Sequence, residues 1–143
     1  MNEPYVITNM SREDVDVAVA WAAQEGWNPG LRDAEAFWAA DRQGFLAGHL
    51  DNRIVATISL VSYGPSFAFL GLYIVAPEYR GCGLGLRLFK EAMSRSTATR
   101  VGLDSVLAQR GVYVTSGFTQ AYVSERQQGV GGGEADPAAR PLA

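Results

Sequence analysis

The sequence predicts one α/β domain whose elements follow the order β-α-α-β-β-β-α-β-α-β. Short apolar runs typical of strands alternate with segments of helical periodicity, and turn residues separate them. A length of 143 residues matches a single domain that can bury its own core. A hydrophobic fraction of 48% with a charged fraction of 19% indicates a globular chain rather than a disordered one.

The first quarter of the chain predicts a strand and two helices. Residues 5–8 form a short apolar run typical of a strand. Ser11 is expected to cap a helix that ends at Gly26, since Ser is a favoured N-cap and Gly a favoured helix stop. Asp33 is expected to cap a second short helix through Ala40.

The remaining elements alternate between strands and helices. Residues 44–50 and 53–62 predict a hairpin, because Asp51-Asn52 between them is typical of a tight turn. Residues 69–75 predict a buried strand. Further elements are expected in this order: a helix over 83–95, a strand over 99–103, a helix over 105–116 and a last strand over 118–125.

A glycine-rich turn connects the buried strand to the helix that starts at Gly83. Pro77 ends the strand, and glycines then occupy positions 81, 83 and 85. Glycines let a backbone approach a phosphate closely, and the N–H groups at a helix start point toward such an anion. The segment therefore predicts a ligand that carries phosphate groups.

Two common phosphate loops do not match this segment. A P-loop requires Gly-x-x-x-x-Gly-Lys-Ser/Thr, and the sequence contains no such string. The dinucleotide fingerprint requires Gly-x-Gly-x-x-Gly after the first strand, whereas these glycines alternate and lie in mid-chain.

Three segments together resemble the GNAT superfamily of acyl-CoA N-acyltransferases. Residues 80–85, Arg-Gly-Cys-Gly-Leu-Gly, resemble its Arg/Gln-x-x-Gly-x-Gly/Ala signature. The preceding residues 72–79 and the later run Tyr-Val-Thr-Ser-Gly-Phe at 113–118 are also similar to that family. The resemblance covers residues 5–125 and implies a mixed, mostly antiparallel sheet with helices on both faces.

The resemblance implies that acetyl-CoA is the co-substrate, and the sequence shows no metal site. Backbone N–H groups of the glycine loop are expected to hold its pyrophosphate, and the strand before the loop is expected to carry a bulge and to bind the pantetheine arm. Two alternatives stay open: a plain strand-to-helix turn and a fully paired central strand. The implied coenzyme residues are Tyr73, Ile74, Val75, Arg80, Gly81, Cys82, Gly83, Leu84, Gly85 and Leu86.

The catalytic roles follow from the same resemblance. Tyr113 matches the position of a tyrosine that donates a proton to the leaving thiolate, and its alternative is an aromatic residue of the core. Many relatives carry Asn seven residues earlier, where this chain has Val106. Relatives also place a Glu on the strand, which is absent here. Glu25 is the substitute proposed as general base, and its alternatives are a solvated helix-end charge or proton loss to water.

Trp27 and Asn28 are expected to line the acceptor cleft. They lie in Glu-Gly-Trp-Asn-Pro-Gly at 25–30, a string that resembles a GNAT subgroup often fused to a second acyltransferase-like domain. A helix stop with a core Trp is the alternative. Cys82 is interpreted as a small loop residue and His49 as a surface residue, because their separation on different elements does not indicate a Cys–His pair.

Composition limits the partners and the compartment. A net charge of −3 argues against nucleic acid or an anionic membrane as the main partner. A single cysteine excludes an internal disulfide, the N-terminus lacks a signal pattern, and no apolar run is long enough to span a membrane, so the cytoplasm is the default location.

The sequence thus predicts an N-acetyltransferase domain over residues 1–126 that transfers acetyl from acetyl-CoA to a primary amine in a ternary complex. Residues 127–143 are rich in glycine and are expected to form a flexible tail or an interdomain linker. The alternative function is a coenzyme A-binding module without catalysis, or the inert half of a two-domain acyltransferase. One predicted strand after Gly117 leaves a sheet edge open, which predicts a homodimer or a missing second domain.

Overall fold

The computed structural model describes residues 4–141, which divide into two compact units between Ser105 and Val106. The first unit contains one five-stranded sheet in the order β1-β2-β3-β4-β5, antiparallel except for the parallel pair β4 and β5. The predicted α/β class with a mostly antiparallel sheet is confirmed. The strands are β1 (Val6–Asn9), β2 (Phe45–Leu50), β3 (Arg53–Ser62), β4 (Phe67–Val75) and β5 (Arg100–Leu103).

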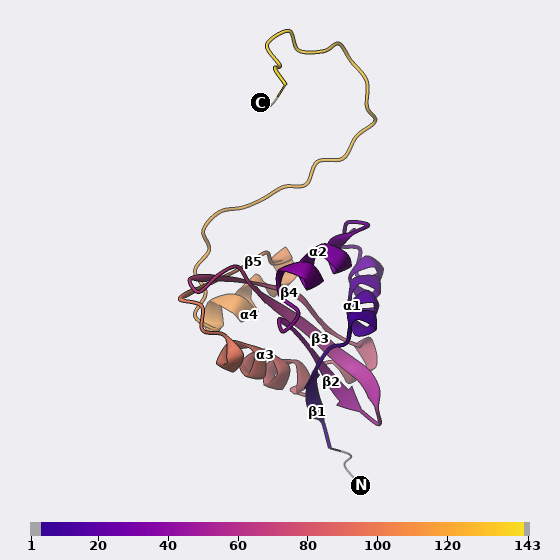
Figure 1. Cartoon of the computed structure of the whole chain (residues 1–143), viewed down its shortest axis with the longest axis vertical. Helices are drawn as coiled ribbons and strands as arrows, with labels where there is room; N and C mark the ends of the chain where they lie inside the picture. The colour runs from indigo at the N-terminus through magenta and orange to yellow at the C-terminus, as the bar shows by residue number, and fades with distance from the viewer. Residues whose placement is uncertain (1–3, 142–143) are drawn as a thin grey trace. The chain divides into compact units, whose positions relative to one another are not determined.

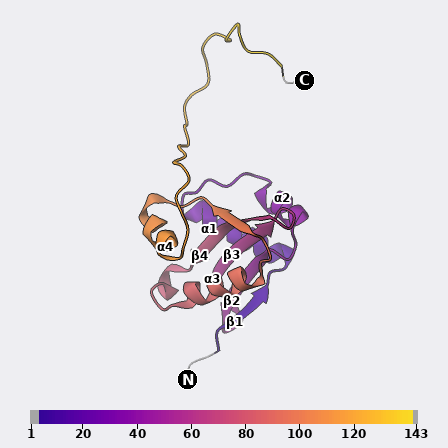
Figure 2. The same cartoon turned by 90° about the vertical axis from the view of Figure 1, so that its left-hand side faces the viewer.

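Helices cover both faces of this sheet, as predicted. Helices α1 (Arg12–Gln24) and α2 (Asp33–Ala40) lie on one face, and α3 (Leu84–Arg95) lies on the other (Figures 1 and 2). Along β2, Phe45 and Ala47 join the core cluster with α1, whereas Leu46 between them lines the α3 side. The two-residue period of a strand thus fills two apolar layers, which is why β2 and β3 read as nearly continuous hydrophobic runs.

Local sequence signals set the boundaries of α1 and of the hairpin. The Ser11 hydroxyl accepts from the Asp14 N–H at 3.2 Å, and the Asp14 carboxylate accepts from the Ser11 N–H at 2.9 Å, which completes a capping box. Asp51 and Asn52 have φ of 49° and 58°, the left-handed values that a type I′ hairpin turn requires.

One predicted cap is wrong. Asp33 is the first residue of α2 and not its N-cap, a position that Arg32 holds without a side-chain hydrogen bond. The Asp33 carboxylate instead accepts from the Gly30 N–H at 2.8 Å. It therefore closes the preceding turn while it places a negative charge at the helix start, where the helix dipole favours it.

The second unit has less regular structure than predicted. A 3₁₀ turn η2 (Leu107–Gln109) and a short α4 (Arg110–Thr115) replace the helix expected over 105–116. Gly111 and β-branched Val112 and Val114 are poor helix formers, and Gly117 ends the segment with a φ of 95°.

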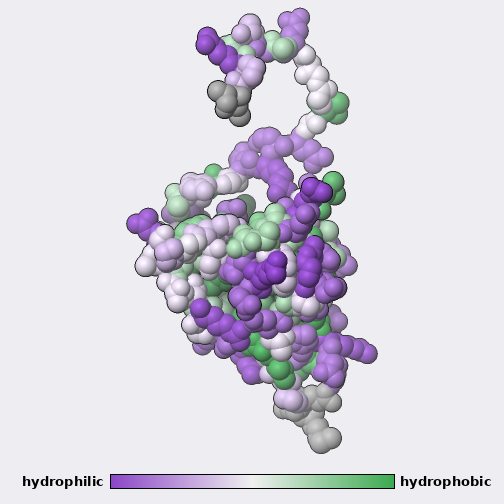
Figure 3. Space-filling model, in the orientation of Figure 1, coloured by the Kyte–Doolittle hydropathy of each residue, from purple (hydrophilic) through white to green (hydrophobic). Residues whose placement is uncertain are grey.

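The last predicted strand, over 118–125, is absent from the structure. No described strand pairs with this segment, and Tyr122 and Val123 are 76% and 67% exposed. An apolar pattern becomes a strand only where a neighbour pairs its backbone, so the pattern alone misled the prediction. Residues 128–141 contain four glycines and a single large hydrophobic residue, Val130, so they offer little apolar surface to bury. Figure 3 draws this segment mainly in purple and white.

Candidate active site

Strand β4 is interrupted by a β-bulge. Thr57 of β3 pairs with Ile74 and Ser59 pairs with Gly71, so two residues of β4 oppose the single residue between them on β3. Leu72, one of the two, has a φ of 47°, which is rare for a leucine. The fully buried Thr57 hydroxyl donates to the Leu72 carbonyl oxygen at 2.8 Å and holds the bulge in place. Thr57 was not among the predicted site residues, although a Thr within an apolar strand was the available signal.

The backbone N–H and carbonyl of Val75, the last residue of β4, point away from β3. The Ala76 N–H donates to the Val55 carbonyl at 2.9 Å, so the N–H and carbonyl of Val75 point to the opposite side. On that side the parallel partner β5 pairs only with residues 67–70. The bulge and the short partner together match the splayed strand that the sequence resemblance implied.

The glycine loop follows directly and is open to solvent. After the 3₁₀ turn η1 (Pro77–Tyr79), Gly81 and Gly83 have φ of 78° and 79°, and a Cβ at either would meet nothing within 4 Å. Gly83 is the N-cap of α3 and provides no side-chain cap. The first intrahelical bond runs from the Arg87 N–H to the Gly83 carbonyl at 3.1 Å, so the N–H groups of residues 84–86 lack an acceptor within the helix. These donors fit a pyrophosphate.

Gly85 has a different role from the two open glycines. A Cβ at Gly85 would lie 2.8 Å from Val75 Cγ2 and 3.0 Å from the Tyr73 hydroxyl oxygen. The missing side chain therefore lets the first turn of α3 pack directly against the end of β4. The Tyr73 ring also packs against Phe89 of α3, with 6.0 Å between ring centroids.

Tyr5, directly before β1, supports the same end of α3, a contact that the sequence did not predict. Its hydroxyl donates to the Leu84 carbonyl at 3.2 Å, and its ring occupies space that a side chain at Gly48 would fill. The Arg87 guanidinium lies 4.9 Å from the Tyr5 ring centroid, in cation–π range. Burial raises the pKa of Tyr5, partly offset by the positive charge of Arg87. The phenol therefore stays protonated and keeps its donor role.

The end of α1 brings Glu25, the predicted base, to this loop. Gly26 has a φ of 80°; its N–H donates to Ala23 and the Trp27 N–H donates to Ala22, both at 3.0 Å. This Schellman motif turns the chain sharply after Glu25. The Glu25 carboxylate accepts from Arg80 Nη2, so the structure joins the predicted base to the predicted coenzyme loop.

Tyr113 lies in the second unit. Its ring packs edge-on against Phe118 with 6.0 Å between centroids, and the Phe118 N–H donates to the Tyr113 carbonyl at 3.0 Å. Burial raises the pKa of Tyr113 above its ordinary value of 10.0. The hydroxyl is therefore protonated at neutral pH and can act as a proton donor.

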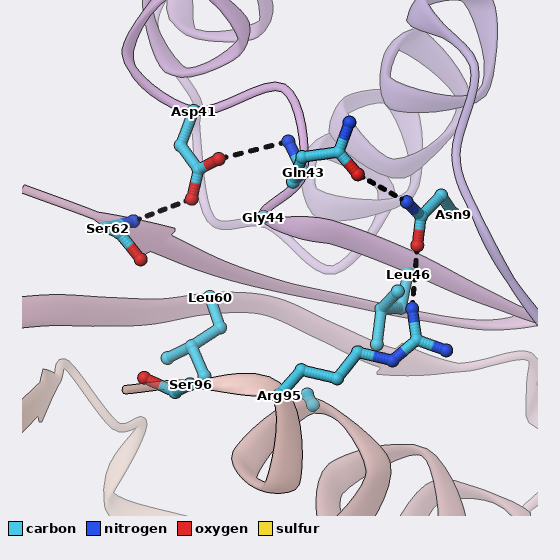
Figure 4. Close-up of a pocket in the computed structure, with 10 residues that line it drawn as sticks. Asn9, Asp41, Gln43, Gly44, Leu46, Leu60, Ser62, Arg95 and Ser96 are labelled. Carbon is cyan, nitrogen blue, oxygen red and sulfur yellow. Dashed lines mark hydrogen bonds between the residues drawn. The ribbon is translucent and has the colours of Figure 1, made fainter. Parts of the chain in front are cut away.

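A cavity of about 300 Å³ lies at the other end of α3 and contains none of the predicted site residues (Figure 4). Its polar groups bind one another. Arg95 Nη1 donates to Asn9 Oδ1 and Asn9 Nδ2 donates to Gln43 Oε1, both at 2.7 Å. The Asp41 carboxylate accepts from the N–H groups of Gln43 and Ser62, both at 3.0 Å. This chain of hydrogen bonds, the α3 brace, ties four elements together.

Residues 4–141 show neither a metal cluster nor a membrane-spanning helix. Within that range no group of three His, Cys, Asp or Glu side chains could hold a metal ion, and no helix is long and apolar enough to cross a membrane. Cys82 is exposed on the glycine loop.

Sequence comparison identifies related proteins. The sequence model of the Acetyltransferase (GNAT) family matches residues 12–118. A holothin acyltransferase from Pseudoalteromonas sp. (strain SANK 73390) is 38% identical over 120 residues, which cover 84% of this chain and 41% of that protein. An uncharacterized protein from Caenorhabditis elegans is 31% identical over 98 residues, 62% of this chain and 28% of that protein. The chain thus spans less than half the length of these curated relatives.

Solved structures share the fold. A protein from Xanthomonas campestris pv. campestris, assigned to the GNAT family, superposes with a TM-score of 0.70 at 23% identity, covering 89% of this chain and 96% of that one. A Mycobacterium tuberculosis protein solved in complex with CoA superposes with a TM-score of 0.65 at 16% identity, covering 85% of this chain and 76% of that one. At these identities the likeness concerns the fold alone.

Proposed function

The chain belongs to the GNAT family of acyl-CoA-dependent acetyltransferases, and on that premise we propose that it transfers an acetyl group from acetyl-CoA to a primary amine. One observation carries the proposal: a bulged β4 ends beside an uncapped helix start and two open glycines. A phosphate-bearing arm and a reacting carbonyl could bind this surface together. The CoA complex of the Mycobacterium tuberculosis protein of the same fold supports this choice of co-substrate.

Binding would use the loop and the strand. The backbone N–H groups of residues 84–86 would hold the pyrophosphate, and Gly81 and Gly83 would let it approach the main chain. The other proposed contacts are backbone groups of Tyr73, Ile74, Val75, Arg80 and Cys82, with Arg87 and Lys90 as nearby cations in the sequence. The outward N–H of Val75 would face the carbonyl oxygen that gains charge during attack.

Acetyl-CoA supplies an activated thioester, and the residues of this chain would guide its reaction with the amine. The amine nitrogen forms a bond to the acetyl carbon while the carbon–sulfur bond breaks. The Tyr113 hydroxyl donates its proton to the departing sulfur. The proton of the amine leaves to Glu25 or to water, and Trp27 and Asn28 would form the wall of the acceptor cleft.

A coenzyme A-binding module without catalysis is the second candidate. It is favoured by the contact between Arg80 and Glu25, because this occupies the carboxylate proposed as base. Release of free thiol from acetyl-CoA with a mixed panel of amines distinguishes the two functions. The enzyme should release thiol with at least one amine, whereas a chain that binds CoA but never releases thiol is the inert module.

The surroundings of the domain are part of the proposal. Residues 1–126 would be the acetyltransferase domain and residues 127–143 a linker or tail, in a protein of the Glu-Gly-Trp-Asn-Pro-Gly subgroup that works in the cytoplasm.

Among the described residues no strand pairs with β5 on the side away from β4. A second copy or a second acyltransferase-like domain would cover that edge, and the greater length of the curated relatives supports the second option. Light scattering at several concentrations tests the first.

A further inference from the structure

The side chain of Arg80 connects three parts of the candidate site. Its Nε donates to the Val75 carbonyl at 2.8 Å, and its Nη2 donates to Glu25 Oε1. These partners are the last residue of β4 and the C-cap residue of α1, and Arg80 itself begins the glycine loop. Glu25 and Arg80 are 55 positions apart in the sequence, so their contact is not a by-product of local chain geometry.

The position of Glu25 is unfavourable for its own helix. A negative charge at a helix C-terminus opposes the helix dipole, and the last turn of α1 contains no basic residue. Arg80 supplies the missing positive charge from the other side of the site. The pair is also only partly exposed, with 33% of the Glu25 side chain and 49% of the Arg80 side chain accessible. The carboxylate is thus placed where Arg80, and not α1, stabilises it.

The two contacts use two of the five N–H donors of the guanidinium. Because the group is planar and rigid, fixing two donors also fixes the direction of the other three. An arginine held in this way at the first position of a phosphate loop is ready to bind an anion without a further loss of side-chain entropy.

We propose, resting on the function proposed above, that Glu25 is a positioning residue that acts through Arg80 and is not the proton acceptor of the reaction. Glu25 and the Val75 carbonyl hold the guanidinium so that its remaining donors meet a coenzyme phosphate. The same contact joins the phosphate loop to the turn that carries Trp27 and Asn28. Coenzyme binding therefore orders the acceptor side of the site.

Whether CoA binds more weakly or more tightly after the Glu25 carboxylate is removed distinguishes this proposal from simple charge repulsion. A carboxylate near a polyanion repels it, so its removal alone would strengthen coenzyme binding. If Glu25 instead orients Arg80, Glu25→Ala should weaken CoA binding by about tenfold, the range expected for losing a charge-assisted hydrogen bond. Glu25→Gln keeps an acceptor oxygen and should change the Kd by only about twofold. Calorimetric titration of each variant of the 143-residue chain with CoA gives these values.

Two controls locate the effect. Glu91→Gln removes the same charge from the Glu91–Arg95 ion pair in the last turns of α3, and should leave CoA affinity unchanged. Arg80→Lys keeps the charge but cannot hold both partners, and should itself weaken binding by about tenfold. Adding Glu25→Ala to Arg80→Lys should then raise the Kd for CoA by less than a further factor of about two, because both changes break the same contact between Glu25 and Arg80.

Hydrogen exchange measures the link to the acceptor side without any catalytic turnover. Saturating CoA should slow exchange of the peptide that spans residues 22–31 in the wild type, and this protection should disappear in Arg80→Lys. No CoA binding by the wild type would refute the proposed function and this inference together. If the wild type does bind CoA, three results would each refute this inference but not the proposed function. The first is that Glu25→Ala binds CoA as tightly as the wild type or more tightly. The second is an undiminished effect of Glu25→Ala when Arg80→Lys is also present, and the third is a lack of protection at residues 22–31.

Discussion

The two ends of α3 differ in how their polar groups are paired. At the N-terminal end Gly83 offers no side-chain cap, and Gly81 and Gly83 hold left-handed conformations beside open space. At the C-terminal end Arg95, Asn9 and the residues of the α2–β2 turn bind one another in the α3 brace. Glycine adopts the left-handed region without strain, and the uncapped N–H groups of the helix start are free to bind an anion. We therefore expect ligand binding at the first end and a contribution to stability at the second.

The most damaging change at the open end should be Gly83→Asp. Asp tolerates a φ near 79° better than most residues, and its charge is favourable at a helix start, so the fold should persist. The same carboxylate would face the pyrophosphate, and CoA affinity should fall by about 10³-fold or more. Calorimetry measures the affinity, and circular dichroism checks the fold.

Gly83→Asn is the matched control for that change. It has the same shape and the same tolerance of the left-handed region, but no charge. It should weaken CoA binding by roughly tenfold or less. Equal losses in both variants would mean that the loop excludes any side chain and does not select an anion, which would break the contrast drawn above.

Tyr113→Phe should separate chemistry from binding. Loss of the hydroxyl should lower turnover by about 10²-fold, the low end for a general acid, while CoA affinity stays unchanged. Because burial raises the pKa of Tyr113, the wild-type enzyme should keep its proton donor up to pH 10.0 and lose it only as the pH rises further. The variant should lack that alkaline decline in its pH–rate profile. An unchanged rate would show that water protonates the thiolate.

Gly85→Ala should have an intermediate effect. Its Cβ would lie 2.8 Å from Val75 Cγ2, so the first turn of α3 must move away from β4. Such overpacking costs about 1–3 kcal/mol and should weaken CoA binding by about tenfold. Gly111→Ala in α4 is the control, since a Cβ there meets nothing within 4 Å and should leave binding unchanged. Full affinity in Gly85→Ala would show that the loop works without its contact to β4.

The sequence could predict those parts of the site whose signal is local. Alternating glycines after an apolar run predicted the loop, and Ser11 predicted the start of α1, because each feature depends on residues a few positions apart. The bulge at Leu72 was expected only from a family resemblance, and its support by Thr57 depends on two strands meeting in a particular register. The sequence alone could not supply that register.

Long-range pairing explains the other differences. The contact between Glu25 and Arg80 joins residues far apart in the chain, so the sequence could name both but not connect them. The strand predicted over 118–125 is absent because it also depends on long-range pairing, which this segment lacks. Its residues are apolar enough for a strand, yet no described neighbour pairs with them. Composition predicts what a segment can form, and only a partner decides whether it forms.

The smallest effect on the site should come from the braced end of α3. Asn9→Ala removes the hydrogen bonds to Arg95 and Gln43, each 2.7 Å long, and should lower the free energy of unfolding by about 1–2 kcal/mol. The brace and the glycine loop are separated by the length of α3, about 18 Å at 1.5 Å per residue, so CoA affinity should change by less than about twofold. Urea unfolding and CoA titration on the same preparation measure both quantities. A large loss of affinity with little loss of stability would place ligand binding at the cavity of Figure 4 and reverse the assignment of the two ends.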